Sequence, residues 1–158
     1  MAVALPVLVL LLMSVFDLTC LVSDRLIAGY ATRQGARLAS ELGNGQGGLT
    51  TTQVDQQIVQ SILASSTNLN FATITEVDVY HPSTSDGSYR SSDPHDSYDR
   101  GGNVLTQGYP ASSRNVTPPN EDSIGVNLQW TFAPPAGIYS FTVQLSEHAV
   151  MRASPVLQ

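Results

Sequence analysis

The feature that most constrains this chain is the apolar run from Ala2 to Phe16, which contains no charged side chain. A helix built from such a run is apolar on every face, so it is stable only in lipid, in a secretion signal or among copies of itself. The run is shorter than the roughly 20 residues that cross a bilayer, and it reaches that length only if Leu18–Val22 are added and Asp17 is tolerated. An isolated helix in water is therefore excluded for this segment.

The helical pattern continues beyond Asp17. Apolar residues recur at helical spacing among charged ones, and no proline interrupts the pattern after Pro6. The predicted helix ends at Gly43–Gly48, because glycine readily adopts the left-handed backbone of a helix C-cap. Residues 1–42 are predicted to form a rod about 60 Å long, followed by a Gly-rich hinge at 43–50 and a small head domain at 51–158.

The charge and cysteine content of the chain exclude several kinds of partner and site. The formal net charge is -6 and the chain has no lysine. Because the acidic and basic residues of the rod balance, the net negative charge lies downstream of it, and an acidic head is unsuited to nucleic acid. Cys20 is the single cysteine, which excludes an internal disulfide and a cysteine-based metal cluster and favours a packing role.

Two signals about export conflict. A secretion signal carries basic residues before its apolar run, whereas the arginines of this rod follow the run. The positive-inside rule would then keep the carboxyl end in the cytoplasm, although the acidic, Ser/Thr-rich remainder is typical of an exported surface. The conflict disappears if a basic leader has been removed, so we expect that Met1 is not the start of the gene product.

The first half of the head is predicted to contain a helix, a strand and a long loop. Thr52 and Asp55 have the spacing of a capping box, and the helix that they open ends near Ser65–Ser66 with one apolar face packed on a sheet. Residues 71–80 are rich in β-branched and aromatic side chains, which predicts a strand. Residues 81–122 form a long polar loop, in which recurring tyrosines are candidate anchors.

The clearest pattern is near the carboxyl end. Apolar and polar residues alternate strictly over 126–132 and again over 139–146, with a Pro- and Gly-containing turn between the two runs. Alternation of this kind predicts an antiparallel hairpin with one wet face. The fold class expected for the whole chain is therefore α+β, a long apolar helix followed by a small antiparallel sheet with one short helix.

No motif for catalysis, cofactor binding or metal binding emerges. The glycines of 43–48 follow a helix and lack the Gly-Lys-Ser/Thr of a phosphate loop. The acidic segment 93–99 does not match a calcium loop and indicates a solvated turn, and the histidines lack zinc spacing. No Gly-x-Ser-x-Gly elbow supports a catalytic serine. Asn115-Val116-Thr117 matches the glycosylation triplet, a signal of low specificity.

Asp17 is the residue with the largest energetic demand. An ionised carboxylate in an apolar rod costs several kcal/mol unless it is protonated or finds a positive partner, and no arginine lies within one helical turn of it. Two interpretations remain open. Asp17 marks the point where the helix leaves lipid, or its partner belongs to another copy of the chain, either the free amino terminus of a neighbour or the neighbour's Arg25.

These features together resemble the type IV filament superfamily, and more closely the TadE/TadG-like pilins and pseudopilins of tight-adherence systems. Three sequence segments carry the resemblance: Ala4-Leu5-Pro6 opening the leucine run with Asp17 about ten residues on, the segment 31–37 on the emerging helix, and the segment 149–152 near the carboxyl end. Such proteins carry a glutamate a few residues after the cleavage point, where this chain has Leu5. Either the chain is trimmed at an unusual place or Asp17 takes over that charge.

The resemblance implies a bacterial pilin: a structural subunit of an extracellular filament used for adhesion, and a homo-oligomer with helices inside and acidic heads outside. It implies a precursor held in the inner membrane, with a prepilin peptidase and pilus assembly machinery as partners, and no nucleic acid, cofactor, metal or catalysis. The expected assembly interface comprises Met1, Leu5, Pro6, Leu8, Leu12, Phe16, Asp17, Leu21 and Arg25.

Three alternatives are kept. The chain could be a minor pseudopilin of such a filament, or a single-pass membrane-anchored binding protein that does not polymerise. The third alternative is an anchored hydrolase that uses the 81–122 loop, which requires converging histidine and carboxylate groups in a pocket. Fibres in the native material would distinguish the filament from the binding protein.

Overall fold

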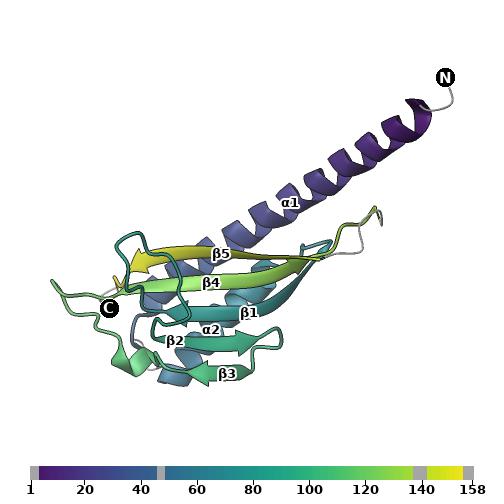
Figure 1. Ribbon diagram of the computed structural model, residues 1–158. Coiled ribbons are helices and arrows are strands. Elements are labelled where there is room, and N and C mark those ends of the chain that lie inside the picture. The colour runs from purple at the N-terminus through teal and green to yellow at the C-terminus, as the bar shows by residue number, and fades with distance from the viewer. Residues whose placement is uncertain (1–3, 46–48, 137–141, 155–158) are drawn as a thin grey trace.

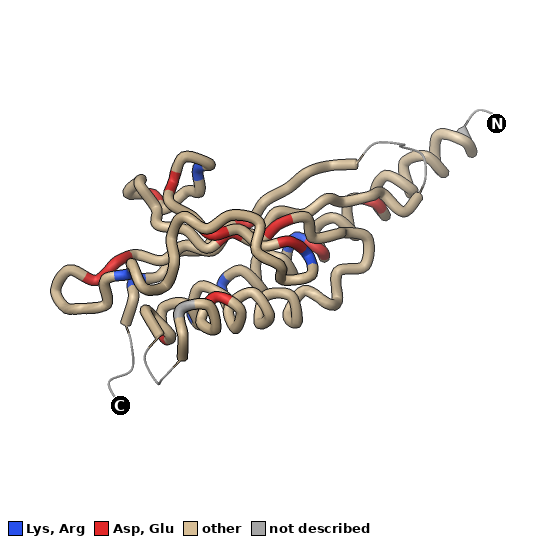
Figure 2. Tube along the Cα trace, turned by 90° about the horizontal axis from the view of Figure 1, so that it is seen from below, with Lys and Arg blue, Asp and Glu red and all other residues tan. Residues whose placement is uncertain are grey.

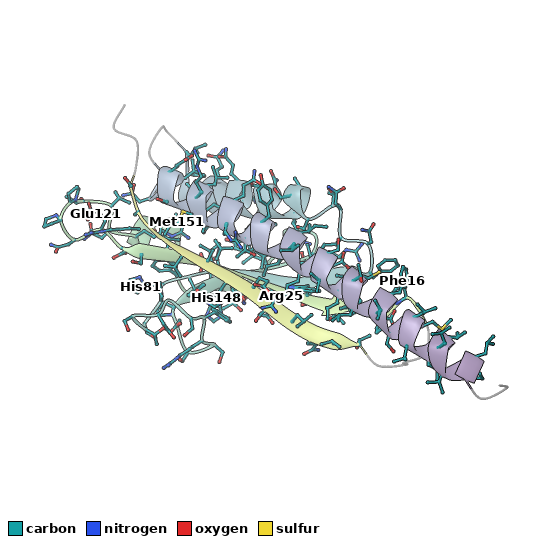
Figure 3. The ribbon with its side chains drawn as sticks, turned by 90° about the horizontal axis from the view of Figure 1, so that it is seen from above. Phe16, Arg25, His81, Glu121, His148 and Met151 are labelled. Atoms are coloured by element: carbon teal, nitrogen blue, oxygen red, sulfur yellow. The ribbon has the colours of Figure 1, made fainter. Side chains whose placement is uncertain are left out.

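The computed structural model describes residues 4–45, 49–136 and 142–154, and it confirms the α+β class (Figure 1). A long helix is followed by a shorter one and by an antiparallel sheet of five strands in the order β3-β2-β1-β4-β5. Both helices cover the same face of the sheet (Figures 1 and 3). The elements are α1 (Ala4–Leu42), α2 (Thr51–Ser65), β1 (Ala72–Tyr80), β2 (His95–Asp99), β3 (Val104–Gln107), a short 3₁₀ helix η1 (Ala111–Ser113), β4 (Ser123–Phe132) and β5 (Val143–Arg152).

Helix α1 confirms the predicted rod, with Met1 to Val3 outside the described residues. Its amino-terminal part protrudes from the head, while its carboxyl-terminal half lies along α2, β4 and β5 (Figure 1). That half contributes the buried side chains of Ala28, Ala31, Ala36 and Ala39 to the core. The rod is therefore also the central helix of the head, and residues 43–50 connect two helices that pack on each other. Gln46 to Gly48 lie outside the described residues, so the hinge at 43–50 stays a prediction.

Small residues let α1 approach α2 closely. A Cβ atom added at Gly35 would lie 2.5 Å from Cδ1 of Ile62, a buried residue of α2. Real carbon atoms do not approach so closely, so a larger residue at position 35 would force the two helices apart. Gly29, one and a half turns earlier on the same helix, has only the Arg33 guanidinium within 3.7 Å of such a Cβ.

We expect Gly35→Ala to lower the free energy of unfolding by about 1–3 kcal/mol, because an overpacked contact strains its neighbours. Gly29→Ala is the matched control, and it should leave stability unchanged or raise it slightly, because alanine favours a helix over glycine. Thermal unfolding in detergent, followed by circular dichroism, measures both. Equal unfolding temperatures for the two variants would contradict the close packing.

The amino-terminal cap of α2 differs from the prediction. The N-cap is Thr50, whose hydroxyl accepts from the backbone N–H of Gln53, while the Gln53 side chain accepts from the backbone N–H of Thr50. The predicted pair, Thr52 and Asp55, has the same spacing two residues later. A capping box favours Glu or Gln at the third position, so Thr50 and Gln53 were the better match in the sequence. The predicted end near Ser65 is confirmed.

The segment 81–122 was predicted to be a loop, and this is wrong in part, because it contains β2 and β3. The sequence of β2 is polar and lacks apolar alternation, and the strand exists because it pairs antiparallel with β1. The tyrosines do act as anchors: Tyr80 donates to the carbonyl of Gly87 (2.6 Å) and its ring lies edge-on to Tyr89, with 5.0 Å between centroids.

Strand β1 and the β4–β5 hairpin confirm their predictions, but the second face of β4 is only partly wet, because Asn127 on that face is 1% exposed and donates to Asp78 (2.8 Å). β4 and β5 pair antiparallel from Ser123 with Arg152 to Phe132 with Val143. The alternating apolar residues of β4 face the helices and are buried, namely Val126, Leu128, Trp130 and Phe132. Tyr139 and Phe141, which were predicted to start the second strand, lie outside the described residues.

Candidate assembly interface

The protruding part of α1 exposes large apolar side chains around its whole circumference. Between 39% and 69% of the surface of each is exposed in the set Leu5, Val7, Leu8, Val9, Leu10, Leu11, Leu12, Met13, Val15 and Phe16. Pro6 is also exposed, and Figure 3 shows Phe16 on this part of the helix. The helix is long and apolar enough to cross a membrane. The two hydroxyls in this region donate back to helix carbonyls, Ser14 to Leu10 and Thr19 to Val15, which lowers the cost of placing them in lipid.

The structure places five of the predicted interface residues on this exposed surface: Leu5, Pro6, Leu8, Leu12 and Phe16. Met1 lies outside the described residues, and Leu21 is half-buried against the core of the head. The remaining two, Asp17 and Arg25, contact the head of the same chain.

Asp17 lies where the head begins. Its side chain is buried, with 7% of the residue exposed, and its Oδ1 accepts from the backbone N–H of Ala136 at 3.0 Å. Ala136 belongs to the β4–β5 connection. The second oxygen, Oδ2, is buried and has no hydrogen-bond partner in the described part of the chain. Asp17 therefore anchors a loop of the head, and within the described residues its second oxygen is available to another donor.

Asp24 makes a similar contact that the sequence analysis missed. It is 1% exposed, and its two oxygens accept from the backbone N–H groups of Asn70 (3.1 Å) and Phe71 (3.0 Å), at the start of β1. Residues seven apart lie on one helix face, so the spacing from Asp17 was an available signal. Two buried carboxylates thus fix two loops of the head to one side of α1.

Arg25 pairs with Glu147 of β5, with 2.7 Å between Nε and Oε1. The arginine side chain is 65% exposed, so this ion pair contributes little stability. If Asp17 pairs with the Arg25 of a neighbouring copy, it must therefore replace Glu147, the partner that Arg25 already has in its own chain.

A second exposed surface continues along the half of α1 that is attached to the head. Leu18, Val22, Leu26 and Tyr30 are 59%, 49%, 69% and 64% exposed and recur at helical spacing on the side away from the sheet. We call this set the outer stripe. The apolar surface of α1 therefore does not stop where the head begins.

The head also holds a buried ion pair. Arg114 donates to Asp55 (2.6 Å) and to the carbonyl of Tyr109 (3.2 Å), and the two charged side chains are 0% and 4% exposed. Burial raises the pKa of Asp55 to about 6, because the loss of solvent outweighs the attraction of Arg114. The pair connects α2 to the segment after β3, and it explains why Asp55 does not cap α2.

The raised pKa of Asp55 has a defined consequence for stability. The folded state holds this proton up to about pH 6, whereas the unfolded chain releases it near the ordinary value of 3.8. The contribution of protonated Asp55 to the free energy of unfolding is therefore fully present below about pH 4. This contribution, about 1–3 kcal/mol, is lost as the pH rises to about 6. We expect Asp55→Asn to lack this loss, which urea unfolding at several pH values measures.

The pH profile of the parent chain must be compared with that of Asp55→Asn, because other carboxylates change the free energy of unfolding with pH in the opposite sense. Hydrogen bonds from Thr84 and Ser88 lower the pKa of Asp86 to about 2. Such a group loses its contribution when the pH falls, not when it rises. A variant whose pH profile is parallel to that of the parent chain would show that Asp55 titrates normally.

The remaining candidate residues lie in the strands and loops of the head. Within residues 4–45, 49–136 and 142–154, no group of three or more His, Cys, Asp or Glu could hold a metal ion. His95 contacts the carbonyl of Asp93 (2.7 Å), and Asp99 accepts from Gly101 and Asn103 (both 2.8 Å), as expected for an acidic turn. Asn115 is exposed, and its amide donates to the carbonyl of Asn120 (2.8 Å).

Fold and surface together define a membrane-capable helix that carries a small α+β head. Residues 1–37 match the family model described as TadE-like protein, so the amino-terminal segment of this chain is similar to that of TadE-like proteins. The match covers the apolar run, both buried carboxylates and the outer stripe, and it does not reach the segment 149–152. No curated protein matches the chain, and no solved structure does.

Proposed function

We propose that this chain is a structural, non-catalytic subunit of an extracellular filament of the type IV or Tad kind. In this proposal the α1 helices of many copies pack around a common axis and the acidic heads face outward. The observation that supports it is the unpartnered apolar surface of α1, which surrounds the helix up to Phe16 and continues as the outer stripe. The TadE-like match of the same segment supports it independently.

The physical reason is the cost of exposure. Each large apolar side chain contributes roughly 1.5–3 kcal/mol when it leaves water, and lipid and neighbouring helices both provide that burial. The same surface therefore suits two stages, a subunit held in the inner membrane by α1 and a subunit packed in a filament. Prepilin peptidase and pilus assembly machinery are the partners that this proposal implies.

Electron microscopy of sheared surface material, with amino-terminal sequencing of the fibres, tests the proposal. We expect fibres that contain this chain. A monodisperse species in detergent with no fibres in the native material would support the alternative, a membrane-anchored binding protein. Low abundance in otherwise normal fibres would indicate a minor pseudopilin.

The free oxygen of Asp17 sharpens the test. If Asp17 also meets the amino terminus of a neighbour, Asp17→Ala should reduce fibres at least about tenfold and leave membrane insertion intact, because it would leave the neighbour's positive charge buried without a partner. Asp17→Asn is the matched control. Its amide oxygen can still accept from Ala136, so it removes the charge and keeps the contact with the head. Normal fibres from Asp17→Asn would overturn the charge pairing and leave the filament itself standing.

A further inference from the structure

Two segments that meet at one end of the head, beside Asp17, contain no charged residue. The sequence contains no Asp, Glu, Arg or Lys from 67 to 75 or from 127 to 146. The described parts of these segments include the start of β1 and the end of β4. We call residues 69–73 and 131–136 the charge-free end. Phe71 and Ala133 are exposed there, and the Ala133 N–H donates to the carbonyl of Phe71 (2.9 Å), which joins the two segments.

This end lies beside a part of α1 whose outer surface is still apolar. Asp17 contacts Ala136, and the outer stripe continues past that level through Val22 to Leu26. At 1.5 Å per residue, Leu26 lies about 14 Å beyond Asp17 along the helix axis. The head and the apolar surface of α1 therefore overlap in depth, so a layer that covers Leu18 and Val22 also reaches the charge-free end.

The backbone at this end is suited to an apolar layer. In lipid, an N–H group without an acceptor costs several kcal/mol. From Ala133 to Ala136, every residue either donates its backbone N–H to an acceptor or is a proline, which has no N–H. Ala133 donates to Phe71, Pro134 and Pro135 have no N–H, and Ala136 donates to Asp17. A loop that faced only water would not need this arrangement.

Charged residues appear again along the part of α1 that is attached to the head. Arg25 and Glu147 form an ion pair between α1 and β5, at the level of Leu26. Arg100 is exposed and lines a groove with Leu69 and Thr73, so it borders the charge-free end. Arginine side chains at such a boundary suit the phosphates of lipid headgroups. Figure 2 shows the protruding part of α1 largely free of charge and the other charged residues distributed over the head.

We propose that the charge-free end of the head is a second membrane contact, and that it enters the interfacial layer of a phospholipid bilayer beside α1. The boundary of that layer lies near the level of Arg25 and Glu147. This contact goes beyond filament assembly and does not require it, since a subunit that never polymerises would make it as well.

The experiment places one label at each end of β4, in the full chain reconstituted in vesicles of phosphatidylcholine and phosphatidylglycerol. Cys20→Ser removes the natural thiol. Ala133→Cys at the charge-free end and Asn120→Cys at the opposite end then carry the same environment-sensitive fluorophore. The ten residues of β4 separate the two ends by about 30 Å. Lipids with a nitroxide near the headgroup are the quenchers.

We expect quenching at position 133 to exceed that at position 120 by about threefold or more, since interfacial groups lie within about 5–10 Å of the headgroup boundary. Equal quenching at both positions would overturn the proposal, because it would indicate either no contact or unspecific adsorption. Quenching that fell as the protein was diluted in lipid would also overturn it, because neighbouring copies would then bring the label to the membrane. Unfolding curves of the labelled chains identify any variant that fails to fold.

Discussion

Leu26→Glu is expected to reduce the number of filaments by at least about tenfold, while the chain still inserts in the membrane and folds. Leu26 belongs to the outer stripe and is 69% exposed, so the substitution removes little contact within the chain. In a bundle of α1 helices the same position faces a neighbour, and an unpaired carboxylate buried there costs several kcal/mol. Filament counts in electron micrographs, set against the amount of subunit in the membrane, measure the effect.

Leu105→Glu is the matched control for this prediction. Leu105 lies on the edge strand β3 and is 57% exposed, so both variants replace a largely exposed leucine by the same charge. Only Leu26 lies on α1. Normal filament numbers for Leu26→Glu would contradict a role of the outer stripe in assembly, and equal losses for both variants would indicate a general effect of added charge.

Arg114→Met is expected to lower the free energy of unfolding by about 3–5 kcal/mol, because it leaves Asp55 buried without its ion-pair partner. Protonation of Asp55 should reduce this loss in mild acid, since burial already raises the pKa of that carboxyl to about 6. Urea unfolding is the measurement, and Trp130, the single tryptophan of the chain, is buried and serves as the fluorescent reporter.

The double variant Asp55→Leu, Arg114→Met distinguishes a lost partner from a general packing defect. Nε and Nη1 of Arg114 are buried without a hydrogen-bond acceptor among the described residues, so the pair is incompletely compensated for its desolvation. Removing both charges together should therefore restore most of the stability. A double variant as unstable as the sum of the two single ones would show that the pair contributes through its shape and not through its charges.

The spacing of apolar residues along the chain was enough to predict helix α1 and the β4–β5 hairpin. The apolar run and the helical spacing after Asp17 predicted α1, and the strict alternation around Trp130 predicted the hairpin. Strand β2 could not be predicted, because His95 to Asp99 are polar and become a strand only through pairing with β1. The cap of α2 was missed although the sequence contained the signal, since Thr50 and Gln53 match a capping box and Thr52 and Asp55 match only its spacing.

The candidate interface was predicted in part for the same reasons. The apolar composition of the segment 2–16 was enough to predict that Leu5, Leu8 and Leu12 are exposed, and the structure places them as expected. The in-chain contacts of Asp17 and Asp24 could not be predicted, because their partners are backbone N–H groups, which have no sequence signature. Those partners lie 119 and 46 positions further along the chain.

The contacts along α1 have a mechanical consequence. Asp17 fixes one loop of the sheet, Asp24 fixes a second, and near the other end Ser40 donates to the carbonyl of Arg152 (2.5 Å) and accepts from the N–H of Ser154 (3.1 Å). A pull applied to the helix is thus shared by three widely spaced attachment points, and no single joint carries the load. Whatever withdraws this helix from its surroundings must move the sheet with it as one rigid piece.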